Sequence, residues 1–123
     1  MTLVEGLRAV WRALAPHSGQ VEPVLVALDE WRTQLAWCVA PLVFDRRRQV
    51  VLRQGRAIAR LADIRTVDVQ HVSGDDDGPE HWRVSLGTGV FSDVEIGATR
   101  VDVEASIAAA RIATLLDVPV RAL

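Results

Sequence analysis

The residues of this chain that are best suited to binding chemistry are its arginines, and seven of the fourteen lie between positions 45 and 65. A guanidinium group donates hydrogen bonds from a planar fork that matches a carboxylate or a phosphate. The stretch is therefore a candidate anion-binding surface on a turn and the strands beside it. Its candidate residues are Arg46, Arg47, Arg48, Arg53 and Arg56.

Charge is segregated along the chain, although the formal net charge is only −2. Residues 45–65 hold seven arginines against Asp45 and Asp63, whereas residues 66–104 hold nine acidic residues against Arg83 and Arg100. Opposed charges of this kind can pair within the fold, between copies of the chain, or with an outside partner. The order of residues alone does not decide among the three.

Metal chemistry has weak support in the sequence. Cys38, His71 and His81 are the side chains that would suit zinc, yet no two of them have the short spacing of a zinc site. The acidic run at residues 75–77 is not followed by the spaced ligands and closing glutamate of an EF-hand loop. We expect no metal and no cofactor.

Catalytic motifs are equally weak. The Gly-Thr-Gly run at residues 87–89 falls between two expected strands, and it lacks the lysine and the following helix of a phosphate-binding loop. The serines have no nucleophile elbow around them, and no base can be paired with any of them from the sequence. We therefore expect a protein that is not an enzyme.

The length of 123 residues and the half-apolar composition predict a single domain with one hydrophobic core. The only cysteine, Cys38, lies in an apolar run and has no partner for a disulfide within the chain, which favours a reducing compartment. The N-terminus does not resemble a secretory signal, and the longest apolar run, residues 35–44, is about half the roughly 20 residues of a spanning helix. We expect a cytoplasmic location and no transmembrane segment.

The first expected element is an amphipathic helix over residues 2–15, ended by Pro16 and Gly19. Its apolar face needs a cover, which is its own domain, a partner subunit or a membrane surface. The membrane is the weakest of these because only Arg8 and Arg12 supply basic charge. The partner-binding candidates on this face are Leu3, Leu7, Trp11 and Leu14.

Residues 22–35 fit two structures. Apolar residues recur at helical spacing from Val21 to Leu35, with Pro23 at a permissible first-turn position, whereas the run from Val24 to Val26 suits the start of a strand. We favour a helix here. The chain is then an N-terminal helical extension over residues 1–35 followed by a domain over residues 36–123.

The middle of the chain has the pattern of short strands joined by tight turns. We expect strands over residues 37–44, 49–53, 56–61, 64–72, 80–86 and 90–96, and a charged loop over residues 73–79. Because the connections are short, the sheet is expected to be antiparallel. Trp31, Trp37 and Trp82 are the expected aromatic anchors of the core.

A closing helix is expected over residues 101–116, and Pro119 follows its end. Thr99 and Asp102 have the spacing of a capping box. The stripe that this helix should bury comprises Ala105, Ala108, Ile112, Leu115 and Leu116.

Together, several of these segments resemble the bacterial PH-like domains. The segments are FDRRRQVVL, a glycine-containing turn, LADIRTVDV, an acidic loop, HWRVSL and IAAARIATLLDVPV, within residues 42–120. The resemblance implies an α+β fold, a bent antiparallel sheet or partly open barrel of five to seven strands closed by a C-terminal helix, here preceded by one or two N-terminal helices. In many members the domain accompanies membrane helices, which we do not expect in this chain.

PH-like domains are interaction modules, so the resemblance also implies a function. We expect a non-catalytic protein-interaction or scaffold module that self-associates or is a subunit of a larger assembly. The alternative is an anionic lipid headgroup or phosphate ligand bound by the arginine-rich hairpin, because phosphoinositide-binding PH domains use the loop between their first two strands in this way. Nucleic-acid binding is disfavoured because the isoelectric point is about 5.9 and no aromatic residues alternate with the arginines.

Overall fold

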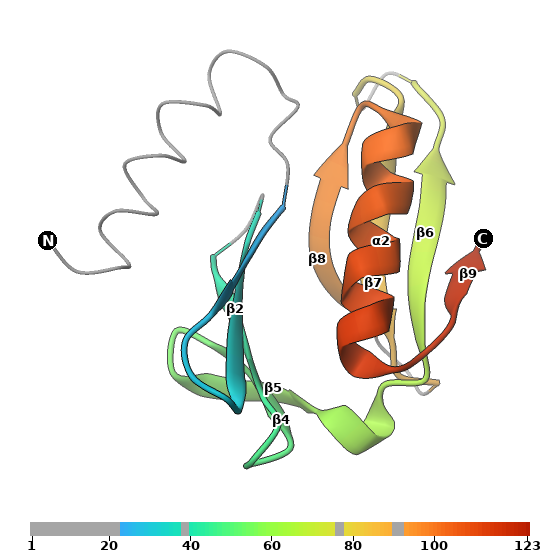
Figure 1. The fold of residues 1–123 in the computed structure, drawn as a ribbon. Coiled ribbons are helices and arrows are strands. Elements are labelled where there is room, and N and C mark those ends of the chain that lie inside the picture. Colours follow the sequence, from blue (N-terminus) through green and yellow to red (C-terminus); the bar gives the residue numbers. More distant parts are fainter. Residues whose placement is uncertain (1–22, 38–39, 76–77, 90–92) are drawn as a thin grey trace, which may run out of the picture.

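The computed structural model describes residues 23–37, 40–75, 78–89 and 93–123, which form two β-sheets and a helix near the C-terminus (Figure 1). The first sheet contains β1 (Val24–Ala27), β2 (Arg32–Ala36), β3 (Leu42–Asp45), β4 (Val50–Arg53) and β5 (Arg56–Arg60). The second sheet contains β6 (Thr66–Val72), β7 (His81–Gly87), β8 (Val94–Thr99) and β9 (Val120–Ala122). A short 3₁₀ turn, η1 (Leu61–Asp63), connects the two sheets, and α2 (Asp102–Leu116) precedes β9.

The first sheet is an antiparallel meander in which the strands follow one another in chain order. Gln54 and Gly55 join β4 to β5, and both have positive φ, 52° and 77°, as a type I′ hairpin turn requires. Because the strands alternate in direction, the β1–β2 turn and the β3–β4 turn lie at the same end of the sheet. The turn between β4 and β5 lies at the opposite end.

The second sheet has the strand order β8-β7-β6-β9. The first three strands are antiparallel, but β9 pairs with β6 in parallel, with Val67 opposite Val120. The expectation of a wholly antiparallel sheet is therefore wrong at this edge. The physical reason is the crossover through α2, which lets a strand return in the same direction as its neighbour.

The helix α2 covers one face of the second sheet and contacts all four of its strands (Figure 1). The residues that it buries are Ala105, Ala108, Ala109, Ile112 and Ala113. Alanine side chains are small, so the helix axis can approach the sheet closely. The predicted helix and most of its predicted stripe are confirmed, although Leu115 and Leu116 are only partly buried.

The start of α2 differs from the predicted capping box. Val101 is the N-cap residue and makes no side-chain cap. The Thr99 hydroxyl instead accepts a hydrogen bond from the Val101 N–H (3.2 Å) and donates one to Glu104 Oε2 (2.9 Å). The helix ends at Leu116, and the next residue, Asp117, has a left-handed φ of 56° that stops further helical bonding.

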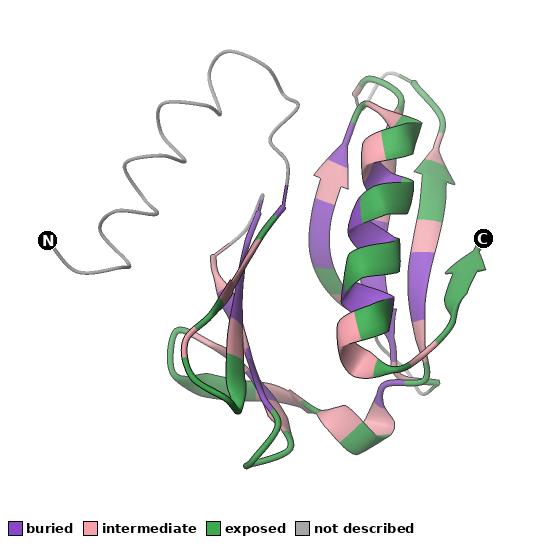
Figure 2. Cartoon of the chain, in the orientation of Figure 1, coloured by how far each residue is buried: buried purple, intermediate pink, exposed green. Residues whose placement is uncertain are grey.

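One hydrophobic cluster includes residues of both sheets and of α2 (Figure 2). Trp37, just after β2, is only 2% exposed and packs over Gly97 of β8, where an added Cβ atom would overlap the indole ring. Of the three expected tryptophan anchors, Trp37 is buried, Trp82 is partly buried, and Trp31 is 44% exposed. Trp31 is therefore not a core residue.

The predicted helix over residues 22–35 is wrong, because β1 and β2 form a hairpin with Val24 opposite Ala36. The Asp29 carboxylate closes the turn, since its Oδ1 accepts hydrogen bonds from the N–H groups of Trp31 and Arg32, both 2.8 Å. Such local side-chain bonds to the backbone compete with helix formation. The helix expected over residues 2–15 lies outside the described residues.

The strand count also differs from the expectation, with nine strands among the described residues rather than five to seven. The two sheets include β1 and β2, in a segment for which the sequence favours a helix, and β9, which the sequence pattern does not predict. The last predicted meander strand is displaced towards the C-terminus, from residues 90–96 to Val94–Thr99. The coarse prediction of an α+β fold with a helix near the C-terminus is confirmed.

Candidate binding sites

The arginine-rich turn is built by the acid that precedes it. Asp45, at the end of β3, is 5% exposed, and its Oδ1 accepts hydrogen bonds from the N–H groups of Arg47 and Arg48, both 3.0 Å. This arrangement is an Asx turn, in which a side chain replaces a backbone acceptor. The three arginine side chains of residues 46–48 are consequently held on an exposed loop.

One of these arginines, Arg46, is hydrogen-bonded to the neighbouring β1–β2 turn. Arg46 donates from its backbone N–H to the Trp31 carbonyl (2.9 Å) and from Nη2 to the Glu30 carbonyl. Strand pairing explains these contacts. Because Arg32 lies opposite Asp45 in the β2–β3 register, the residue after Asp45 lies beside the residues before Arg32. Arg46 therefore ties two turns together.

The β1–β2 turn also brings acidic groups to the cluster. Arg32 Nε donates to Asp29 Oδ2 (2.8 Å), and hydrogen bonds from Trp31 and Arg32 lower the pKa of the Asp29 carboxyl. The four arginines at this end of the sheet, at positions 32 and 46–48, face Asp29, Glu30 and Asp45, so the local formal charge is about +1. The formal charge of residues 45–48, which is +2, is thus lowered to about +1 by the neighbouring turn.

Arg53 and Arg56 lie elsewhere. They are paired across the β4–β5 turn, at the end of the first sheet that is opposite to Arg46. Arg53 Nη2 reaches across to the second sheet and donates to the Glu95 carbonyl (3.1 Å). The five predicted anion-binding residues therefore do not form one site.

Other arginines pair with acids of the same fold. Arg60 binds Asp63 through Nε and Nη2, and these contacts raise the pKa of Arg60. Arg121 of β9 binds Asp68 of β6 through the same two atoms, which raises the pKa of Arg121. These four residues pair within the fold, but neither pair joins the basic stretch to the acidic one.

The two histidines among the described residues, His71 and His81, belong to hydrogen-bonded contacts near the β6–β7 hairpin. His71 Nε2 lies 2.6 Å from Glu80 Oε1, and its ring lies 4.9 Å from that of Trp82. His81 Nδ1 lies 3.0 Å from the Pro79 carbonyl oxygen. Within the described ranges, no three His, Cys, Asp or Glu side chains are grouped as metal ligands; Cys38 lies outside these ranges.

The outer face of α2 carries apolar side chains that the sequence did not single out. Val103 is 60% exposed, Ile107 is 46% exposed, and Ala110 is also exposed, at positions i, i+4 and i+7 of the helix. In the sequence, these three residues recur at helical spacing and so lie on one face of the helix. This face is next to the one that is buried against the sheet. We call Val103, Ile107 and Ala110 the α2 outer strip.

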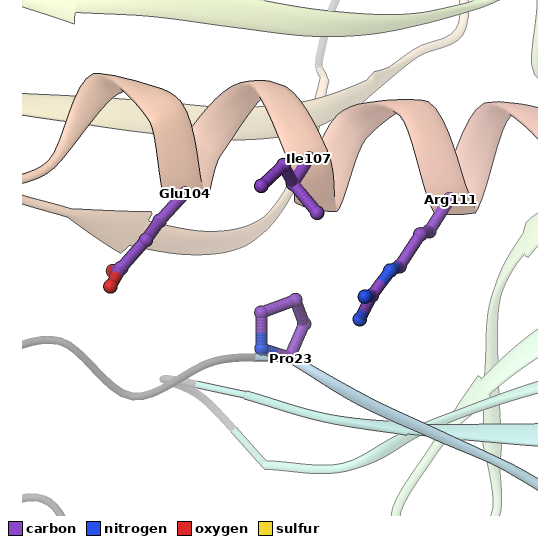
Figure 3. Close-up of a pocket in the computed structure, with 4 residues that line it drawn as sticks. All are labelled: Pro23, Glu104, Ile107 and Arg111. Atoms are coloured by element: carbon purple, nitrogen blue, oxygen red, sulfur yellow. The ribbon is translucent and has the colours of Figure 1, made fainter.

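A shallow pocket lies at the centre of this strip. It is lined by Pro23, Glu104, Ile107 and Arg111 (Figure 3). Glu104 and Arg111 bracket Ile107 with opposite charges, and Pro23 is the first described residue after the segment that contains the apolar candidates. Those four candidates, Leu3, Leu7, Trp11 and Leu14, lie outside the described residues.

Comparisons with known proteins identify no relative. No family model matches this chain, and no curated protein or solved structure is similar enough to match it. In the part of the chain that the structure describes, no helix is both long and apolar enough to cross a bilayer. The sheet-rich α+β fold with its C-terminal helix is compatible with the PH-like resemblance.

Proposed function

We propose that this chain is a non-catalytic, cytoplasmic protein-interaction module with a variant PH-like fold, and that its partner is a second copy of itself. The observation that carries the proposal is the α2 outer strip, where apolar side chains are exposed on a helix whose other face is buried. Exposed apolar side chains that share one face of a helix offer a surface for a partner to cover.

The charges beside the strip favour a second copy. Glu104 lies three residues before Ile107 and Arg111 lies four residues after it. If two copies associate antiparallel about a two-fold axis near Ile107, with Pro23 of each copy included in the interface, Glu104 of each copy is directed towards Arg111 of the other. A surface that complements itself in this way suits a symmetric dimer.

The α2 outer strip is too small to hold a dimer alone. A 15-residue helix is about 22 Å long and about 10 Å wide, so one face offers about 220 Å². A stable interface takes roughly 800 Å² from each partner. The segment before Pro23 supplies the remainder in this proposal, with Leu3, Leu7, Trp11 and Leu14 as contact residues.

The test is the solution mass of charge variants. We expect Ile107→Asp to lower the mass to that of a monomer, because it buries a charge at the centre of the interface. Ala62→Asp, an equivalent charge at an exposed position of η1, should leave the mass unchanged. Equal association of the Ile107 variant would contradict the role of α2.

The N-terminal segment is tested in the same assay. The pair Leu7→Asp and Trp11→Ser should dissociate the assembly while circular dichroism and the unfolding midpoint stay unchanged. If the variant unfolds and the oligomeric state does not change, these residues belong to the core of a single chain.

A second candidate function is anion binding at the β3–β4 turn. It is favoured by Arg47 and Arg48, whose exposed side chains have no hydrogen bond or ion pair with any other described residue, and by the exposed Trp31 nearby. It is opposed by the local formal charge of about +1.

Liposome binding separates the two candidates. Arg47→Glu with Arg48→Glu should abolish salt-sensitive binding to anionic vesicles if this turn is the site. Equal binding by that variant and the unaltered chain would remove the second candidate. Dimer formation should be unaffected in either case.

A further inference from the structure

One edge strand of the first sheet lacks the features that protect the other sheet edges. Strand β1 has the sequence Val-Leu-Val-Ala, it contains no charged residue, and its register with β2 is unbroken. The exposed edge of such a strand is a template for pairing with another chain. Natural proteins blunt such edges with charged side chains, prolines or bulges, and β1 has none of these within its bounds.

The other three edge strands of the described sheets carry such protection. Strand β5 begins at Arg56 and ends at Arg60, and a register shift interrupts its pairing with β4. Strand β8 contains Glu95 and pairs with β7 across another register shift. Strand β9 is three residues long, and its central residue is Arg121. Among these four edges, β1 is therefore the unprotected one.

The hydrogen bonds of the β1–β2 hairpin show which backbone groups of β1 are free. The Leu28 N–H donates to the Arg32 carbonyl (2.8 Å), so the backbone groups of the even-numbered residues of β1 are directed at β2. The backbone groups of Leu25 and Ala27 are directed away from β2, and no other described strand pairs with them. Their N–H and carbonyl groups are available to a further strand.

We infer that the free edge of β1 pairs antiparallel with β1 of a second copy, about a two-fold axis at Val26. In this register Leu25 of each copy lies opposite Ala27 of the other, and each of these pairs exchanges two backbone hydrogen bonds. Val26 then faces its own counterpart, and Val24 faces Leu28. The cross-strand contacts are apolar, and no like charges are opposed.

The neighbouring registers offer fewer hydrogen bonds. Moving the axis to Leu25 places Pro23 opposite Ala27, and proline has no N–H to donate. Moving the axis to Ala27 places Asp29 opposite Leu25, but the Asp29 N–H is directed at the Arg32 carbonyl (3.4 Å). The edge complements itself best in one register, which favours a second copy as its partner.

This inference rests on the proposed self-association and names a segment that supplies part of its interface. Pro23, the residue before β1, lines the same pocket as Ile107 (Figure 3), so the open edge begins beside the α2 outer strip. The strip alone is too small for a stable dimer. Pairing of β1 adds directional backbone bonds and joins the first sheets of the two copies into one continuous sheet.

Amide hydrogen exchange, followed by NMR at high and low protein concentration, tests the pairing. We expect the amides of Leu25 and Ala27 to exchange about tenfold or more slowly in the dimer than after dilution to the monomer. The Val26 amide is an internal reference, because it is directed at β2 and should be protected in both states.

A proline substitution tests the same bonds by affinity. Ala27→Pro removes an outward N–H from each copy and no bond to β2, and proline is tolerated on edge strands in this orientation. We expect it to weaken the dimer by about tenfold or more, as for the loss of two interfacial hydrogen bonds. Ala27→Val keeps the N–H, suits a strand and should leave the dimer unchanged. Sedimentation equilibrium measures both dissociation constants.

The outcomes separate this inference from the proposal on which it rests. A dimer in which the amides of Leu25 and Ala27 exchange as fast as in the monomer would overturn the β1 pairing and leave the α2 interface in place. Protection that persists in the monomer would also overturn it, because the cover would then belong to the same chain. A monomer at every concentration would refute the self-association itself. The exchange measurement on the unaltered chain decides the question even if the proline variant misfolds.

Discussion

Arg121 and Asp68 form a two-pronged ion pair across the parallel edge of the second sheet. Arg121 Nε donates to Asp68 Oδ1 (3.0 Å) and Nη2 donates to Oδ2 (2.8 Å), and the Thr66 hydroxyl donates to the same Oδ1 (2.7 Å). Asp68 is 1% exposed, whereas the Arg121 side chain is 55% exposed. The pair fastens β9, three residues long and wholly exposed, to β6.

Arg121→Gln should destabilise the fold, because it takes the guanidinium donors away from a buried carboxylate that keeps the Thr66 hydroxyl as a donor. The loss of stability should be modest, since water can enter where the exposed arginine stood. Urea denaturation measures the change. Replacing both residues, as Asp68→Asn with Arg121→Gln, should cost less than the sum of the single changes; full additivity would mean that the pair does not stabilise the fold.

Gly97→Ala should destabilise the protein by about 1–3 kcal/mol, the usual range for overpacking a filled core. The reason is local, because the added methyl group would overlap the indole of Trp37. Trp37→Leu vacates that space, so the alanine should cost much less in a chain that already carries Trp37→Leu. Chemical denaturation of the four proteins of this cycle measures the coupling, and equal costs in both backgrounds would contradict the packing.

Asp45→Ala should cost about 1 kcal/mol, since two backbone N–H groups of the arginine-rich turn lose their acceptor. Asp45→Asn keeps an oxygen acceptor and is the matched control. We expect the asparagine variant to retain most of the stability in thermal unfolding. If both variants lose the same stability, the carboxylate charge, rather than the acceptor, is what matters.

Asp29 gives the β1–β2 turn a pH dependence of defined sign. Its pKa is lowered from the ordinary value of 3.8 by hydrogen bonds from Trp31 and Arg32. A lowered pKa stabilises the fold above the ordinary value, and this contribution is lost as the pH falls through the folded pKa.

The matching measurement compares the unaltered chain with Asp29→Asn between neutral pH and about pH 3, below the ordinary pKa of aspartate. The stability difference should be largest at neutral pH and should shrink on acidification. It should be small throughout because the pair is exposed. A difference that grows on acidification would contradict the assigned contacts.

Local sequence signals predicted the elements that depend on local chemistry. The Gln54–Gly55 turn, the strand at Arg56–Arg60 and the helix α2 were all predicted from turn residues and apolar spacing. The prediction of a helix over residues 22–35 was wrong because the apolar positions of this segment fit both a helix and a pair of strands. What decides is Asp29, whose carboxylate closes a turn at a place where helical spacing alone shows no break.

The candidate sites depend on contacts that sequence spacing does not reveal. The β1–β2 turn, with Asp29 and Glu30, lies beside the arginine turn because Arg32 pairs with Asp45. The hydrogen bond from Arg53 to the Glu95 carbonyl joins residues 42 positions apart. Sheet register and the packing of two sheets create these contacts. The helical spacing of Val103, Ile107 and Ala110 is visible in the sequence. It was not used as a prediction because the neighbouring stripe of buried residues has the stronger apolar pattern.

The most direct test of the proposed self-association is the solution mass of the unaltered chain, measured by light scattering at low and high salt. An apolar interface around Ile107 predicts a dimer or a larger closed assembly that persists at high salt, because burial of apolar surface is not screened. A monomer at all protein concentrations, or an assembly that dissociates as salt is added, would contradict the proposed interface.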